Sequence, residues 1–119
     1  LIAMELNIPW VIIRKRQYNL PGEIQILQQT GYSKNNMYIN SVVPGNNVII
    51  IDDIVSTGGT LKAIIDTLNA LYVNVLGSYV IAEKNNATDH LRHDGYNISA
   101  LINIIMGKDC IKSVEPKSI

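Results

Sequence analysis

The chain has 119 residues, of which 47% are apolar and 17% charged, and ten basic side chains balance ten acidic ones. This composition excludes an intrinsically disordered tail, which is poor in apolar residues, and the zero net charge argues against a duplex-binding surface, which needs an excess of Lys and Arg. The single cysteine, Cys110, excludes an internal disulfide and a Cys/His zinc site, and favours a reducing, cytoplasmic setting. Because the longest apolar runs fall short of about 18 residues, no membrane span is expected. We therefore expect one globular domain.

The first third of the chain alternates apolar and polar stretches. Residues 1–6 have the spacing of the end of an amphipathic helix, and 10–13 form a short apolar run that is typical of a buried parallel strand. Residues 17–34 are mainly polar and indicate a long loop, and loops of this length inside a domain are usually functional. A short strand is expected over residues 37–43.

The remaining elements alternate strand and helix. Buried strands are expected over residues 48–51, 73–82 and 100–106, each of which is rich in Ile, Val, Leu or Ala. Apolar residues at helical spacing predict a helix over 61–71 that packs on the sheet. A last, antiparallel strand is expected to run through Val114. This alternation predicts an α/β fold with an open, mainly parallel sheet flanked by helices.

Two histidines stand in the polar stretch 85–96. His90 and His93 are three residues apart, a spacing that would let both face a metal ion if the segment were helical. With no further ligands near them in the sequence, we favour a solvated linker. Cys110 has no neighbouring base and is interpreted as a small apolar side chain.

The residues best suited to bind a ligand follow the apolar run 48–51. In an open α/β sheet, ligands bind beyond the carboxyl ends of the strands. Free amides and the dipole of a helix N-terminus attract a phosphate, and adjacent carboxylates suit the hydroxyls of a sugar, directly or through magnesium. Alone, each half of the pattern could be a plain turn, but together they predict a ribose 5-phosphate site. The residues are Asp52 and Asp53 for the sugar, and Ser56, Thr57, Gly58, Gly59 and Thr60 for the phosphate.

The stretch Val48–Thr60 resembles the phosphoribosyl pyrophosphate motif of the type I phosphoribosyltransferases. The flanking stretches 8–23, 29–34 and 37–40 are similar to the purine members, in particular to the archaeal hypoxanthine/guanine phosphoribosyltransferases, which share the layout of the adenine enzymes. The resemblance extends from Leu1 to about Val114. It implies the type I phosphoribosyltransferase fold with a long flexible lid loop, and transfer of phosphoribosyl from the pyrophosphate ester to a purine base, with Mg2+ as cofactor.

The resemblance also implies roles for basic and lid residues. Arg14 and Lys15, after the first predicted strand, would hold pyrophosphate and, with Asp52 and Asp53, form the catalytic set. The alternative is that these two basic residues are only a solvated strand end and bind no ligand. Residues 17–40 would form the lid. Its side chains able to reach the closed site are Tyr32, Ser33 and Lys34.

One position bears on the substrate. Adenine phosphoribosyltransferases carry a glutamate just before the lid tyrosine, where this chain has Gly31. The glutamate's role therefore cannot be carried over, and hypoxanthine or guanine is favoured over adenine. A non-catalytic regulator that senses phosphoribosyl pyrophosphate with the same fold is the competing class, and its DNA-binding part would precede Leu1.

The resemblance finally concerns the extent of the protein. Residues 1–6 have no helix-capping residue before them, so we expect residues 1–119 to be the C-terminal part of a phosphoribosyltransferase domain. An N-terminal hood and the first strand-helix units would lie upstream. The family also implies a homodimer, with neither nucleic acid nor membrane as a partner.

Overall fold

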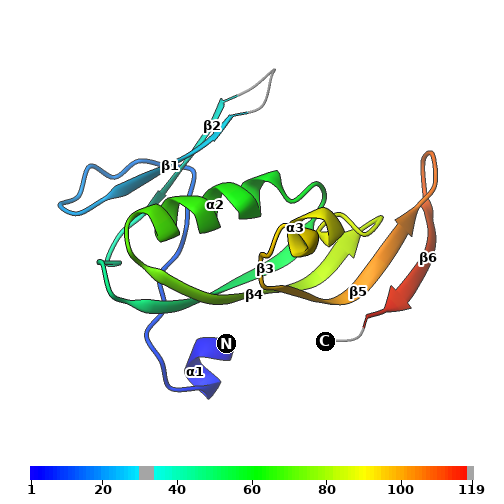
Figure 1. Ribbon diagram of the computed structural model, residues 1–119, viewed down its shortest axis with the longest axis horizontal. Coiled ribbons are helices and arrows are strands. Elements are labelled where there is room, and N and C mark those ends of the chain that lie inside the picture. Colours follow the sequence, from blue (N-terminus) through cyan, green and yellow to red (C-terminus); the bar gives the residue numbers. More distant parts are fainter. Residues whose placement is uncertain (30–33, 118–119) are drawn as a thin grey trace. The chain divides into compact units, whose positions relative to one another are not determined.

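A computed structural model describes residues 1–29 and 34–117 of the chain. The chain forms two compact units, Leu1–Val42 and Val43–Ile119, and each is described by itself. The first unit contains the short helix α1 (Ile2–Glu5) and two antiparallel strands, β1 (Ile24–Gln29) and β2 (Lys34–Ile39), labelled in Figure 1.

The first unit corrects the prediction of a buried strand over residues 10–13. These residues form no strand, and Trp10 and Ile12 are 65% and 60% exposed. A continuous apolar run becomes a buried strand only between partner strands. Within the described residues of this unit, the only pairing near the run is a bridge from Arg14 to Tyr38.

The pairing of β1 with β2 also corrects the predicted loop over 17–34. Its second half is β1, because Ile26 and the facing Met37 bury their side chains when β1 pairs with β2. The expected strand over 37–43 begins earlier, at Lys34, and ends at Ile39, since the pairing with β1 sets its limits. The proposed lid therefore contains two paired strands, β1 before residues 30–33 and β2 after them.

The second unit is an α/β unit with a four-stranded sheet in the order β3-β4-β5-β6. The strands β3 (Asn47–Val55), β4 (Asn74–Lys84) and β5 (Ile98–Met106) are parallel, and β6 (Ile111–Pro116) is antiparallel to β5. The crossovers contain α2 (Gly59–Ala70) and α3 (Asp89–His93), which lie on the same side of the sheet in Figure 1. The predicted open, mainly parallel sheet and its final antiparallel strand are confirmed.

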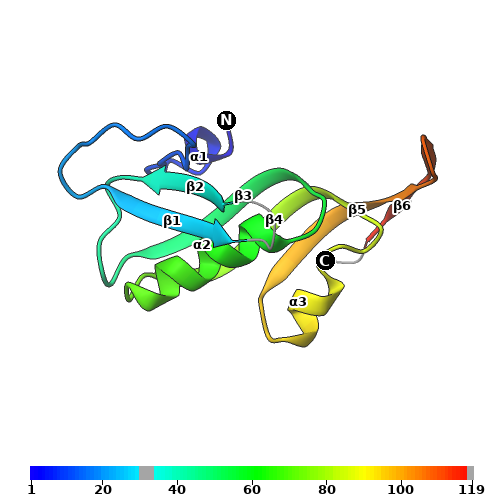
Figure 2. The ribbon, with the colours of Figure 1, turned by 90° about the horizontal axis from the view of Figure 1, so that it is seen from above.

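The helix α2 lies along the sheet, as Figure 2 shows from above. It buries the apolar stripe that the helical spacing predicted, except for Leu71 at its end, which is 37% exposed. The sheet contributes Ile50, Val80 and Ala100 to the same core. The buried residues of α2 are Leu61, Ile64, Ile65 and Leu68.

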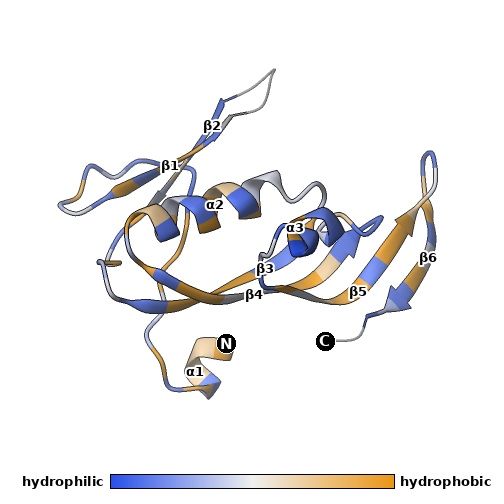
Figure 3. Cartoon of the chain, viewed as in Figure 1, coloured by the Kyte–Doolittle hydropathy of each residue, from blue (hydrophilic) through white to orange (hydrophobic). Residues whose placement is uncertain are grey.

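The strands are less buried than their composition predicts. Apolar side chains are dense on β3, β4 and β5 (Figure 3). Yet Ile51 on β3, Ile81 on β4 and Leu101 on β5 are 46%, 53% and 50% exposed. Successive strand side chains point to opposite faces, so α2 covers only alternate residues. Among the described residues, no helix is long and apolar enough to cross a membrane.

Candidate functional site at the end of β3

The two acidic residues of the candidate site lie inside β3 rather than after it. The strand was expected to end at Ile51, but it continues to Val55, with Asp52 opposite Val80 of β4. Aspartate is disfavoured in strands, but this preference is weak compared with tertiary pairing. Here β4 runs on to Lys84 and supplies backbone partners for the additional residues of β3.

The carboxyl groups of Asp52 and Asp53 interact with each other and with the chain that follows. The backbone N–H of Asp53 donates to Asp52 Oδ1 at 2.9 Å, and that of Ile54 donates to Asp53 Oδ1 at 2.7 Å. Partial burial raises the pKa of Asp52, and the hydrogen bond and charge of the Asp53 carboxyl raise it further, against the opposing effect of the Asp53 N–H. Two such neighbouring carboxyl groups favour a ligand that brings a cation or hydroxyl donors.

The loop after β3 ends in a helix N-terminus whose N-cap residue provides no side-chain cap. Gly58 is the N-cap residue of α2, has a φ of +86° and has no side chain to cap the helix. The first turn, residues 59–62, contains no acidic side chain that would compete for an anion. Thr57 Oγ1 accepts a long hydrogen bond of 3.4 Å from the backbone N–H of Gly59. Amides at such a helix end favour a phosphate.

Gly58 also packs against the segment that contains α3. A Cβ at this position would lie 3.0 Å from Leu91 Cδ1 and 3.4 Å from the carbonyl oxygen of Ala87. A glycine is thus required here for two structural reasons, the left-handed backbone and the lack of space for a Cβ. The sequence had suggested a different reason, the close approach of an anion. Leu91, 1% exposed, was missed at the sequence level, although a lone leucine in a polar stretch was a usable signal.

The histidines of the same segment lie on a helix, not in the expected linker. α3 spans five residues because Leu91 provides an apolar anchor for one turn. His90 is exposed, and its Cε1 lies 3.6 Å from where a Gly58 Cβ would be. Across residues 1–29 and 34–117, no group of three or more His, Cys, Asp or Glu side chains is arranged to hold a metal ion.

A buried carboxylate anchors the start of α3. Glu83 is fully buried at the end of β4, and it accepts a 2.9 Å hydrogen bond from the backbone N–H of Thr88 and another from its hydroxyl. It also pairs with Lys117 and, at 3.3 Å, with Arg92. Burial alone would raise the pKa of Glu83, but hydrogen bonds from Lys117 and Thr88 and the charge of Arg92 lower it to about 2.

The predicted basic residues belong to the first compact unit. Arg14 is not a free cation: its Nη2 lies 2.5 Å from Glu23 Oε2 and 2.5 Å from Asn40 Oδ1, and its guanidinium carbon lies 3.9 Å from the centre of the Tyr18 ring. The sequence contained no local pattern that predicted these partners. Lys15 and Lys34 are exposed, whereas Tyr32 and Ser33 lie outside the described residues.

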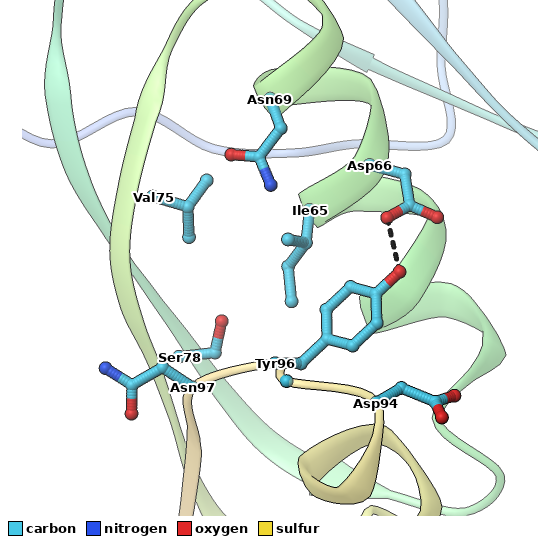
Figure 4. A pocket seen from close by; sticks show the side chains of 9 residues that line it. Ile65, Asp66, Asn69, Val75, Ser78, Asp94, Tyr96 and Asn97 are labelled. Atoms are coloured by element: carbon cyan, nitrogen blue, oxygen red, sulfur yellow. Dashed lines mark hydrogen bonds between the residues drawn. The ribbon is translucent and has the colours of Figure 1, made fainter.

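A cavity of about 310 Å³ lies away from this site, by the amino-terminal ends of β4 and β5. Figure 4 shows the Tyr96 hydroxyl pointing to Asp66 of α2, where it donates a 2.6 Å hydrogen bond to Oδ1. The cavity is mainly polar and open. The end of β3, rather than the cavity, carries the chemistry that the sequence predicted.

An open, mainly parallel sheet, with paired carboxylates and a glycine loop leading into a helix, is typical of the class of proteins that bind a phosphorylated sugar or nucleotide. The family of phosphoribosyl transferase domains matches residues 1–112. The chain belongs to this family, which confirms the resemblance first seen in residues 48–60.

The chain is similar to the hypoxanthine/guanine phosphoribosyltransferase of Methanothrix soehngenii, with 38% identity over 97% of this chain and 61% of that protein. It is also similar to the enzyme of the same name from Ferroglobus placidus, with 41% identity over 96% of this chain and 61% of that protein. Among solved structures, it is similar to adenine phosphoribosyltransferase from Thermoanaerobacter pseudethanolicus, with a TM-score of 0.73, 26% identity, and 86% of this chain and 60% of that one covered. The chain thus spans about 60% of the length of the curated relatives that it matches.

Proposed function

We propose that the protein to which this chain belongs transfers a phosphoribosyl group from phosphoribosyl pyrophosphate to hypoxanthine or guanine. The products are the nucleoside monophosphate and pyrophosphate. The observation that carries this proposal is the close succession of Asp52, Asp53 and the N-terminus of α2 within a phosphoribosyl transferase domain. Hypoxanthine/guanine enzymes about 40% identical to this chain support the choice of base.

In this proposal, each part of the site holds one part of the substrate. The amides of residues 56–60 hold the 5′-phosphate, and Asp52 and Asp53 accept hydrogen bonds from the ribose hydroxyls. The bond from the ribose carbon to pyrophosphate breaks, the bond to the base nitrogen forms, and the proton of that nitrogen passes to solvent. Positive charge develops on the sugar in the transition state, where the first bond is largely broken and the second is not yet formed. Carboxylates near the sugar stabilise that charge.

The basic residues hold the leaving group. Lys15 is exposed and available as it stands, whereas Arg14 has to exchange Glu23 and Asn40 for pyrophosphate oxygens. Residues 17–40, with Tyr32, Ser33 and Lys34, close over the site and exclude water.

Magnesium fits the chemistry of the two aspartates. Asp52 and Asp53 are neighbouring carboxylates whose mutual repulsion a cation relieves, and hard oxygen ligands with several retained waters are what Mg2+ prefers. These two residues would hold the ion, which would neutralise part of the pyrophosphate charge.

A homodimer in the cytoplasm completes the proposal. The dimer rests on the family resemblance, and the reducing compartment on Cys110, which is exposed and unpaired. Adenine is the second candidate base, because adenine enzymes are among the similar solved structures.

The direct test is turnover of hypoxanthine, guanine and adenine with phosphoribosyl pyrophosphate by the intact protein across a magnesium series. We expect the two oxopurines to be consumed and adenine to be a poor substrate. Preference for adenine would replace the proposed base, and a folded protein that consumes none of the three bases would overturn the activity.

A binding experiment tests the aspartates separately. Asp53→Asn should weaken phosphoribosyl pyrophosphate binding by about tenfold in calorimetry, because a charge-assisted hydrogen bond is lost. Asp109→Asn, at an exposed turn between β5 and β6, is the matched control and should leave the affinity unchanged. Equal affinities of the Asp53 variant and wild type would refute the assigned role.

A further inference from the structure

The candidate phosphate loop has a packing partner outside the motif. Leu91 Cδ1 lies 3.0 Å from the Cβ position of Gly58, and Leu91 is 1% exposed. Gly58 has a φ of +86°, a conformation that glycine adopts readily but also leaves readily. The contact from Leu91 therefore restricts the residue in the loop that has the most conformational freedom.

The helix that carries Leu91 is too short to hold its own position. α3 has five residues, and its N-cap residue, Thr88, makes no side-chain capping bond. Isolated helices of this length are unstable in water. Its position must come from tertiary contacts at both ends.

Two such contacts fix α3. At its start, fully buried Glu83 accepts hydrogen bonds from the backbone N–H and the hydroxyl of Thr88, which is also fully buried. Near its end, Arg92 Nε donates to the carbonyl of Ile98 at 2.9 Å, and Arg92 also pairs with Glu83. A continuous set of contacts thus runs from the end of β4, through α3, to the N-terminus of α2.

We propose that Leu91 is a positioning residue for the 5′-phosphate subsite and that Glu83 and Thr88 hold it in place. The proposal rests on the proposed function, because it concerns how residues 56–60 receive the phosphate. With Leu91 in contact, Gly58 is already in the conformation that directs the amides of α2 to the ligand. Without it, binding has to order the loop, which weakens the affinity.

The test compares two buried leucines of the second unit. Leu91→Ala removes the contact with Gly58, whereas Leu68→Ala truncates a leucine that is 2% exposed at the far end of α2. Calorimetry with ribose 5-phosphate and with phosphoribosyl pyrophosphate measures the affinity of the phosphate subsite. Pyrophosphate alone, which has no 5′-phosphate, is the control ligand. Steady-state kinetics then gives kcat, and KM for each substrate, for both variants.

We expect Leu91→Ala to bind ribose 5-phosphate about fivefold to thirtyfold more weakly, the factor that corresponds to fixing the backbone of one residue. KM for phosphoribosyl pyrophosphate should rise, with pyrophosphate binding and kcat little changed. Leu68→Ala should bind ribose 5-phosphate within twofold of wild type despite a similar loss of stability. Leu91→Met should restore most of the affinity.

If Leu91→Ala does not fold, Leu91→Val and Thr88→Val test the same contact and its anchor. Equal losses in the Leu91 and Leu68 variants, or unchanged affinity for ribose 5-phosphate in folded Leu91 variants, would overturn the inference. A wild-type protein that binds neither ribose 5-phosphate nor phosphoribosyl pyrophosphate would instead overturn the proposed function.

Discussion

The ionised state of Glu83 should make the second unit sensitive to acid. The pKa of this carboxyl falls from its ordinary 4.5 to about 2, because hydrogen bonds from Lys117 and Thr88 and the charge of Arg92 outweigh its burial. At about 1.4 kcal/mol per pH unit, this difference contributes about 3 kcal/mol to the free energy of unfolding. Since the native pKa is the lower one, the contribution is complete above pH 4.5 and is lost as the pH falls toward 2.

Glu83→Gln isolates this contribution, because glutamine has the shape of the protonated acid. We expect urea unfolding, followed by circular dichroism, to show wild type more stable than Glu83→Gln by about 3 kcal/mol at pH 7. The gap should narrow by about 2 kcal/mol at pH 3. Glu115→Gln, an exposed position on β6, is the control and should change stability by less than about 0.5 kcal/mol. A gap between wild type and Glu83→Gln that stays constant from pH 7 to pH 3 would refute the assignment of the charge to Glu83.

Four further changes test other contacts. Gly58→Ala should destabilise the protein by about 1–2 kcal/mol more than Gly45→Ala in urea unfolding. Both glycines have a positive φ, but the added Cβ would lie 3.0 Å from Leu91 Cδ1 at Gly58 and would have no neighbour within 4 Å at Gly45. Equal losses of stability in the two glycine variants would exclude the contact with Leu91. Tyr96→Phe should cost about 1 kcal/mol in the same assay, because it removes the 2.6 Å hydrogen bond to Asp66. Lys62→Met should leave the urea midpoint almost unchanged, since the pair of Lys62 with Asp66 is exposed, and a clear shift of the midpoint would mark a wider network. Glu23→Gln should tighten pyrophosphate binding severalfold in calorimetry, because it releases Arg14, and weaker binding would show that the ion pair positions Arg14 for the ligand instead.

The candidate site was predictable from the sequence where it is a local pattern. The succession of Asp52, Asp53 and the glycine loop stands within thirteen residues, and a helix after it was expected from the spacing of Leu61, Ile64 and Leu68. The chemistry of carboxylates and helix amides depends on these neighbours alone. The burial of Leu91 had a local signal, but its contact with Gly58 and the anchoring by Glu83 were not predictable, because both residues are distant in the chain from Gly58.

The sequence by itself determined the order of the strands and of α2 in the second unit, and the family to which the chain belongs, whereas α3 was missed. Apolar periodicity is a property of consecutive residues, and it specifies which face of α2 is buried before any partner is known. Only the tertiary structure decided that β3 continues through Asp52 and Asp53, that residues 24–29 pair with residues 34–39, and that Arg14 pairs with Glu23. Each of these depends on a partner elsewhere in the chain, so no local propensity could have specified it.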